Sequence, residues 1–192
     1  PALPQTALPS GWKTSPQRLT RDFVYKHASD KNFIVATYIN HKRLDFAFTM
    51  VRHLVALEQP HYIVGAMDLP ALEGLLSKGV NSFYINSGLT TEDYGDAHRR
   101  SNTSSPLPPW PRPPRPPRPP RPSHPPQSAP PSGWGTPNFR KMGLHKVQLV
   151  LDLAKLGVDA LTVDADAFML LEPWQFIRRY PRADVLMSSD ML

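Results

Sequence analysis

The chain has 192 residues, of which 40% are hydrophobic, enough for one domain with a sizeable core. It contains no cysteine, which excludes disulfides, thiolate zinc sites and cysteine nucleophiles. The sequence also has no His-Glu-x-x-His pair, no Gly-x-x-x-x-Gly-Lys-Ser/Thr loop and no Gly-x-Gly-x-x-Gly fingerprint. These absences argue against a zinc hydrolase, a P-loop nucleotidase and a dinucleotide-binding oxidoreductase.

The net charge of +6 comes largely from one segment of the chain. Four of the 22 lysines and arginines lie in a proline repeat, and without them the net charge falls to +2. The basic balance is therefore poor evidence for nucleic-acid binding. No apolar run approaches the length of a membrane span, and no signal-peptide pattern opens the chain. Because it starts at Pro1 and stops directly after an apparent strand, we expect a fragment of a longer protein.

The first third of the chain predicts alternating strands and helices. Residues 1–30 are a lead-in rich in Pro, Ser and Thr, predicted to be largely unstructured, with some helical character at 18–27. Apolar, β-branched runs and helical spacing then predict strands at 33–38, 62–67 and 82–85, with helices at 44–57 and 69–78 between them. This order indicates an α/β fold with a mostly parallel sheet and flanking helices.

Residues 101–132 interrupt this pattern with a repeat of proline and arginine at 111–122. Proline fixes φ and removes hydrogen-bond donors, so the segment can form only a solvated polyproline II rod or disorder. We interpret it as an insert in a surface loop, although it could also be a ligand for a domain with an aromatic groove. The predicted organisation is thus a lead-in (1–30), a first α/β part (31–100), the insert (101–132) and a second α/β part (133–192).

Regular structure is predicted again after the insert. Thr136 is a good N-cap and Pro137 a good first helical residue, so a helix is expected over 137–156, with Gly157 after it. A strand at 158–163, a short helix at 174–179 and a further strand at 184–187 follow.

Asp164 and Asp166 follow the predicted strand at 158–163 directly. Strand alternation would place both carboxylates on one side, where they repel each other unless a cation or a shared proton relieves them. Ligands of α/β sheets bind at the carboxyl ends of the strands, and Asn40 and Asp68 are expected at the same edge. An oxygen-only pair suits Mn²⁺ or Mg²⁺ completed by substrate phosphates. The pair therefore predicts a metal site for a phosphate-bearing substrate, although Asp is also common in turns.

Four motifs occur in an order that resembles one enzyme family. They are Val-Gly-Ala-Met-Asp at 64–68, Gly-Trp-Gly-Thr-Pro-Asn-Phe-Arg-Lys-Met-Gly at 133–143, Asp-Ala-Asp at 164–166 and Ala-Asp-Val-Leu-Met-Ser-Ser-Asp at 183–190. With them the chain resembles the nucleotide-diphospho-sugar transferases of glycosyltransferase family 77. Within that family it is most similar to the plant and green-algal arabinosyltransferases that act on hydroxyproline-rich, extensin-type proteins. The resemblance covers about residues 32–192 without the insert.

The resemblance implies a GT-A-like (Rossmann-like) fold, with its nucleotide-binding part at 31–100 and its metal-binding part at 133–192. It further implies a UDP-sugar donor, Mn²⁺ or Mg²⁺, retention of configuration and a hydroxyproline-rich glycoprotein acceptor. It also implies a type II membrane protein of the Golgi lumen, anchored through a segment absent from this chain. Asp164 and Asp166 match the metal motif of the family. Donor-binding positions are implied for Asn40, Asp68, Lys141, Lys146 and Asp190. No catalytic nucleophile is implied.

Two other classes compete with this interpretation. A phosphatase or phosphotransferase of the haloacid-dehalogenase type also carries Asp-x-Asp after an apolar strand, but a Thr or Val is expected there where this chain has Phe168. The second alternative is a proline-rich interaction protein whose insert recruits SH3-like or WW-like partners.

Overall fold

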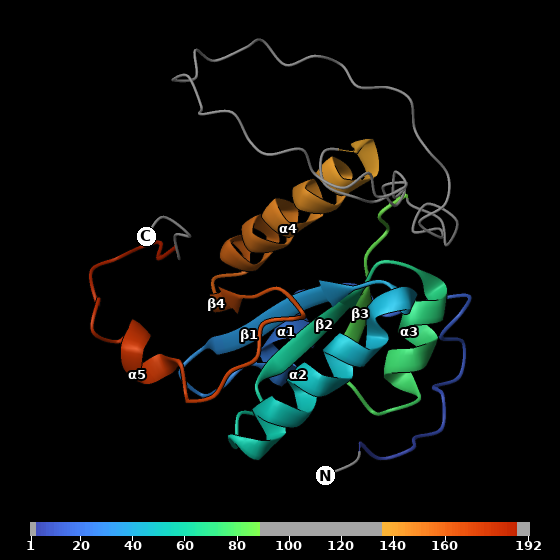
Figure 1. Cartoon of the computed structure of the whole chain (residues 1–192), viewed down its shortest axis with the longest axis horizontal. Coiled ribbons are helices and arrows are strands. Elements are labelled where there is room, and N and C mark those ends of the chain that lie inside the picture. The colour runs from blue at the N-terminus through green and yellow to red at the C-terminus, as the bar shows by residue number, and fades with distance from the viewer. Residues whose placement is uncertain (1–2, 89–135, 188–192) are drawn as a thin grey trace, which may run out of the picture.

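The computed structural model describes residues 3–88 and 136–187, which form a parallel sheet covered by helices (Figure 1). The elements follow one another as α1 (Arg21–His27), β1 (Phe33–Ile39), the 3₁₀-helix η1 (His41–Arg43), α2 (Leu44–Ala56), β2 (Tyr62–Ala66), α3 (Leu69–Leu76), β3 (Ser82–Tyr84), α4 (Pro137–Lys155), β4 (Asp159–Thr162) and α5 (Trp174–Ile177). The predicted alternation of strands and helices is confirmed, with boundaries that differ by a few residues.

The four strands lie in the order β3-β2-β1-β4, and every neighbouring pair is parallel. Strand β1 is therefore central, paired with β2 from Val35↔Tyr62 onward and with β4 from Phe33↔Asp159 onward. Parallel neighbours need crossover connections, and helices α2 and α3 supply those between β1, β2 and β3. The predicted α/β fold with a parallel sheet and flanking helices is thus confirmed.

Side chains of the central strand alternate between two hydrophobic clusters, one on each face of the sheet. Ile34 and Ala36 pack with Val24 of α1 and with Leu149 and Leu153 of α4. Val35 and Ile39 pack on the opposite face with residues of α2 and α3, including Met50, Leu54, Leu72 and Leu75. Figure 1 shows α2 and α3 together on one side of the sheet and α1 behind it. Helices α1 and α4 thus cover one face, and α2 and α3 cover the other.

Helix α4 begins and ends as its sequence predicts. The Thr136 side chain accepts a hydrogen bond from the backbone N–H of Phe139, and Gly157 adopts a φ of +76° just after the helix. Leu149 and Leu153 form the buried face of this helix. Leu144 and Val147 are 68% and 66% exposed.

The lead-in carries one helix, α1, and much of the remainder contacts the core. Leu3 and Trp12 pack against the cluster beneath α2 and α3. The backbone N–H of Tyr84 in β3 donates to the carbonyl of Gln17 at 2.7 Å, so the lead-in covers the edge of the sheet. The insert at 101–132 and the start of the Gly-Trp-Gly motif lie outside the described residues.

One predicted element was wrong. Residues 184–187 form no strand, and Val185 and Met187 are 74% and 88% exposed. A strand is stable only when its backbone groups pair with a neighbour, and within residues 3–88 and 136–187 none is placed beside this segment. In the same described parts of the chain, no helix is both long and apolar enough to cross a bilayer.

Candidate functional site

All four strands point the same way, so the residues that follow them gather at one edge of the sheet. Asn40 follows β1, Asp68 follows β2 after one residue, Ser87 comes soon after β3, and Asp164 follows β4 after one residue. The carboxyl edge of a parallel sheet is where ligands of α/β proteins bind. We call this set of strand ends, with the side of α4 that contacts it, the carboxyl-edge site.

Asp164 and Asp166 occupy a turn rather than a continuation of β4. The strand ends at Thr162, and the backbone N–H of Ala167 donates to the carbonyl of Asp164 at 2.9 Å. Because the turn begins at Asp164, strand alternation does not fix Asp166 on the same side as Asp164, which corrects the argument made from the sequence. Ala165 between them is buried against the core, whereas both aspartates are exposed. The turn thus presents both carboxylates to solvent.

Lys146 of α4 is the closest charged partner of this turn. Its Nζ lies 2.7 Å from Oδ1 of Asp164. Both side chains remain accessible, at 37% and 62% of their area. Leu161 and Val163 pack toward α2 and α3, so alternation along β4 turns Asp164 toward the face that carries α4. The pairing of Lys146 with Asp164 is therefore a consequence of the sheet geometry.

Tyr38 of β1 is the neighbour of Asp164 across the sheet. The register pairs Ala36 with Thr162, so Tyr38 is level with Asp164 on the same face. Burial, and to a lesser extent the negative charge of Asp164, raises the pKa of Tyr38 to about 12. The Tyr38 ring also packs against Met67, which follows β2. The Tyr38 phenol is thus half-buried and uncharged, and it lines one side of the exposed Asp164 carboxylate.

The first half of α4 is fixed to the segment that follows β3. Lys141 Nζ donates to the carbonyl of Gly88 at 3.0 Å, and His145 Nε2 lies 3.1 Å from the carbonyl of Ser87. Ser87 Oγ in turn donates to the carbonyl of Met67 at 2.9 Å. Because these contacts lie near β3 and Lys146 contacts the turn after β4, helix α4 crosses the site from one outer strand to the other.

Asn40 and Asp68 make hydrogen bonds within the loops at this edge. The Asn40 side chain accepts from the backbone N–H of Lys42 at 3.1 Å and caps η1. Asp68 caps α3 by accepting from the N–H of Ala71 at 2.7 Å, and its other oxygen lies 3.1 Å from Nδ1 of His41. Asp68 is only 3% exposed. Its position therefore shapes the loop that carries His41 instead of presenting a carboxylate to solvent.

Two carboxylates in an exposed turn fit a divalent cation of the Mg²⁺ or Mn²⁺ type. Such ions are commonly held by one or two protein carboxylates and completed by substrate phosphates and water. No cluster of three or more His, Cys, Asp or Glu side chains is found among residues 3–88 and 136–187. Asp190, the remaining acidic residue predicted for the site, lies outside that description. The two carboxylates therefore fit an ion whose remaining ligands come from a bound substrate and water.

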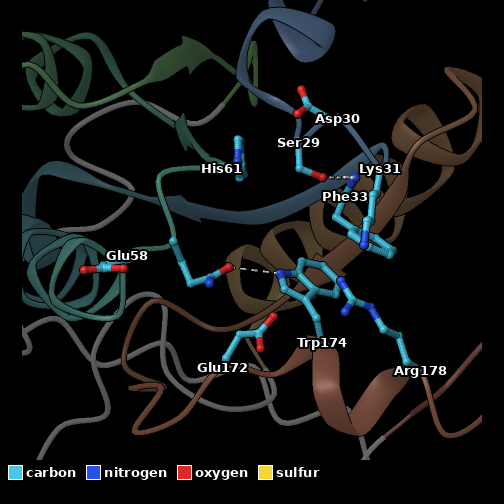
Figure 2. A pocket seen from close by; sticks show the side chains of 10 residues that line it. Ser29, Asp30, Lys31, Phe33, Glu58, His61, Glu172, Trp174 and Arg178 are labelled. Atoms are coloured by element: carbon cyan, nitrogen blue, oxygen red, sulfur yellow. Dashed lines mark hydrogen bonds between the residues drawn. The ribbon is translucent and has the colours of Figure 1, made fainter.

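A hollow of the described surface lies at the opposite edge of the sheet (Figure 2). It measures about 270 Å³ and includes Phe33 at the start of β1, His61 just before β2, and Trp174 of α5. The Phe33 and Trp174 rings stack with centroids 4.4 Å apart, and Trp174 Nε1 donates to Gln59 Oε1 at 3.2 Å. Trp174 is 5% exposed, so its ring faces the protein. This hollow is distinct from the carboxyl-edge site.

Comparison with known proteins shows what this part of the chain is similar to. Residues 116–192, which include α4, β4 and the Asp164–Asp166 turn, match the family of nucleotide-diphospho-sugar transferases. The chain is also 31% identical over 175 residues to the arabinosyltransferase XEG113 of Arabidopsis thaliana. These residues make up 91% of this chain and 21% of that relative. No solved structure matches significantly. The predicted relationship to nucleotide-diphospho-sugar transferases is confirmed, and the chain spans about a fifth of the relative's length.

Sequence reasoning missed three residues of the site: Tyr38, His41 and Ser87. Each lies within two or three residues of a strand end, which was the available signal. The Tyr38 ring was read only as part of an apolar strand, since its neighbour Asp164 is far away in the sequence. Lys141 and Lys146 were predicted, and the structure places them on α4 with different partners, Gly88 and Asp164.

Proposed function

We propose that this chain carries the donor site of a glycosyltransferase that moves a sugar, arabinose by the resemblance, from a UDP-sugar to a hydroxyproline-rich glycoprotein. The observation that carries the proposal is the exposed turn of Asp164 and Asp166 at the carboxyl end of β4, beside a lysine of α4. A carboxylate pair and a nearby cation supply both halves of a site for a metal-bound diphosphate.

The two aspartates would hold Mn²⁺ or Mg²⁺ through their carboxylates. Bound there, the ion supplies Lewis-acid stabilisation of the charge that develops on the UDP leaving group. Ala165 fixes the turn in the core, so the carboxylates keep their place while their oxygens remain accessible. Tyr38 excludes water from one side of Asp164 and stays neutral at physiological pH because its pKa is about 12.

The remaining donor contacts are proposed along the carboxyl edge. Lys146 and Lys141 are the cationic candidates for the diphosphate, and Asn40, just after β1, is the candidate for the base or ribose from the resemblance. Asp68 would contribute through His41, since its own carboxylate is buried and capped. Asp190 is proposed on the sugar side of the site from the resemblance. The catalytic nucleophile is left unassigned, and retention of configuration is the expected outcome.

The proposals for the sugar, the acceptor and the cellular location come from similarity to known proteins. The relative is named as an arabinosyltransferase, which supports arabinose as the sugar. The family resemblance supports a hydroxyproline-rich acceptor in the Golgi lumen. The phosphatase alternative gains no support, because the residues around Asp164 match the transferase family. Comparing Mn²⁺-dependent hydrolysis of UDP-arabinose with that of a phosphomonoester separates the two classes.

Calorimetric titration of UDP into the full chain with Mn²⁺ tests the proposal. We expect Mn²⁺-dependent binding that weakens at least about tenfold in Asp164→Ala and in Asp166→Ala, because each removes a charged ligand of the ion. Asp159→Ala is the matched control, since Asp159 is exposed at the opposite end of β4. Unchanged affinity in both site variants, or an equal loss in the control, overturns the metal assignment.

A further inference from the structure

The contact between Lys146 and Asp164 places an ammonium group where a metal ion has to bind. The 2.7 Å separation leaves no room for a ligand between Nζ and Oδ1. A cation held by Oδ1 therefore competes with Lys146 for that oxygen. An exposed pair of this kind is weak, which makes exchange of the partner easy.

The charge balance of the site differs between its metal-free and metal-bound states, and this changes whether Lys146 has a counter-ion. Asp164 and Asp166 carry two negative charges, and Lys146 compensates one of them. A divalent cation on the two carboxylates cancels both, so Lys146 is then left without a counter-ion. A diphosphate entering the same site brings negative charge that an ammonium can bind with charge-assisted hydrogen bonds.

The architecture allows the side chain to move while the helix stays in place. The Lys146 ammonium sits on a flexible stem, its side chain is 37% exposed, and within residues 3–88 and 136–187 its polar contact is with Asp164. The helix itself is fixed by Lys141 and His145 against the segment after β3, and by buried Leu149 and Leu153. A change of partner at Lys146 therefore needs rotamer changes of one side chain.

We propose that Lys146 is an exchangeable counter-ion: it neutralises Asp164 before the metal arrives and transfers to the donor diphosphate when the metal takes its place. This inference rests on the proposed function, since it assumes a metal-diphosphate ligand. It makes Lys146 a positioning residue that opposes binding of the metal alone and favours binding of the metal with the nucleotide. The two effects have opposite signs, which distinguishes exchange from an ordinary ligand role.

Two titrations of the full chain test the exchange. Electron paramagnetic resonance of free Mn²⁺ gives the affinity for the metal alone, and calorimetry gives the affinity for UDP at saturating Mn²⁺. In Lys146→Met we expect the Mn²⁺ affinity to rise about twofold to fivefold, because a competing surface ion pair is removed. We expect the UDP affinity to fall about tenfold, because a charged contact to phosphate is lost. Lys146→Arg keeps the charge and restores both affinities toward those of the wild type.

Lys155→Met is the matched control for a general effect of charge. Lys155 is exposed in the last turn of the same helix, nine residues from Lys146. That separation is about 13 Å along the helix, beyond the Debye length of about 8 Å at physiological ionic strength. Neither affinity is expected to change in this variant.

Each result decides between two claims. If the wild type binds no UDP with Mn²⁺, the proposed function fails, and the exchange fails with it. If UDP binds but Lys146→Met lowers both affinities, or changes neither, the exchange is overturned while the donor site stands. An equal response in Lys155→Met also overturns it, since the effect is then one of net charge.

Discussion

Both edges of the sheet carry charged residues. At the amino edge they surround packed aromatic rings, whereas at the carboxyl edge two carboxylates are exposed to solvent. At the amino edge, α5 is held against the sheet by Trp174, which contacts Phe33 and Gln59. The Arg178 guanidinium lies 5.5 Å from the Phe33 ring centroid. At the carboxyl edge, Asp164 and Asp166 stand exposed in a turn, where the described contact to a charged group is the single pair with Lys146.

This contrast shows why the hollow at the amino edge is a poor guide to the chemistry. The aromatic groups around the amino-edge hollow are turned into the protein and contribute to stability by burial. Asp164 and Asp166 at the carboxyl edge contribute little to stability, because both are exposed and exposed ion pairs are weak. Charges that do not stabilise the fold are available for a ligand. The comparison therefore predicts that stability and ligand binding respond to different edges.

The largest effect on stability is expected from Trp174→Ala at the amino edge. Trp174 is 5% exposed and stacked on Phe33, so truncation should lower the free energy of unfolding by about 3–5 kcal/mol. Urea unfolding followed by circular dichroism measures the change. Phe176→Ala on the same short helix is the control, because Phe176 is 56% exposed. Equal losses in the two variants would contradict a role for Trp174 as the anchor of α5.

A smaller loss is expected from Asp68→Ala at the carboxyl edge. The variant removes the N-cap of α3 and the contact with His41, which should cost about 1–2 kcal/mol of unfolding free energy. Asp45→Ala is a suitable control, since Asp45 is exposed in the first turn of α2 and its loss should cost about 0.5 kcal/mol. Thermal unfolding of the three proteins decides whether Asp68 is structural. A loss no larger than that of the control argues for a ligand role instead.

Asp164→Ala should leave stability within about 0.5 kcal/mol of the wild type while it weakens Mn²⁺-dependent binding of UDP at least about tenfold. The reason is that Asp164 is 62% exposed and its described ion pair lies at the surface. Chemical unfolding and calorimetry on the same preparation measure both quantities. A loss of several kcal/mol would remove the distinction between the two edges.

The last effect, which is confined to alkaline pH, is expected from Tyr38. Its pKa is raised from 10.0 to about 12 in the folded chain, so the folded state favours the protonated phenol. The contribution of Tyr38 is fully present below pH 10.0 and is lost progressively as the pH rises through about 12. The wild type should therefore lose stability relative to Tyr38→Phe over that range. Parallel pH profiles of the two proteins would contradict the burial of the phenol.

Local sequence signals predicted most elements because they act over a few residues. Thr136, Pro137 and Gly157 set the limits of α4 through capping and backbone conformation. Apolar runs predicted β1 and β2, which are buried on both faces of the sheet. The same kind of run at 184–187 failed, since apolar alternation predicts a strand only where a neighbouring strand can pair with it.

The sequence by itself determined the parallel α/β fold, the candidate carboxylates Asp164 and Asp166, and the relationship to nucleotide-diphospho-sugar transferases. Only the tertiary structure decided what stands beside those carboxylates. Tyr38 is separated from Asp164 by more than a hundred residues, and strand register brings the two level. Lys146 contacts Asp164 because α4 crosses the face toward which β4 turns that side chain. Capping and periodicity act locally, whereas register and helix docking depend on the packing of the whole sheet.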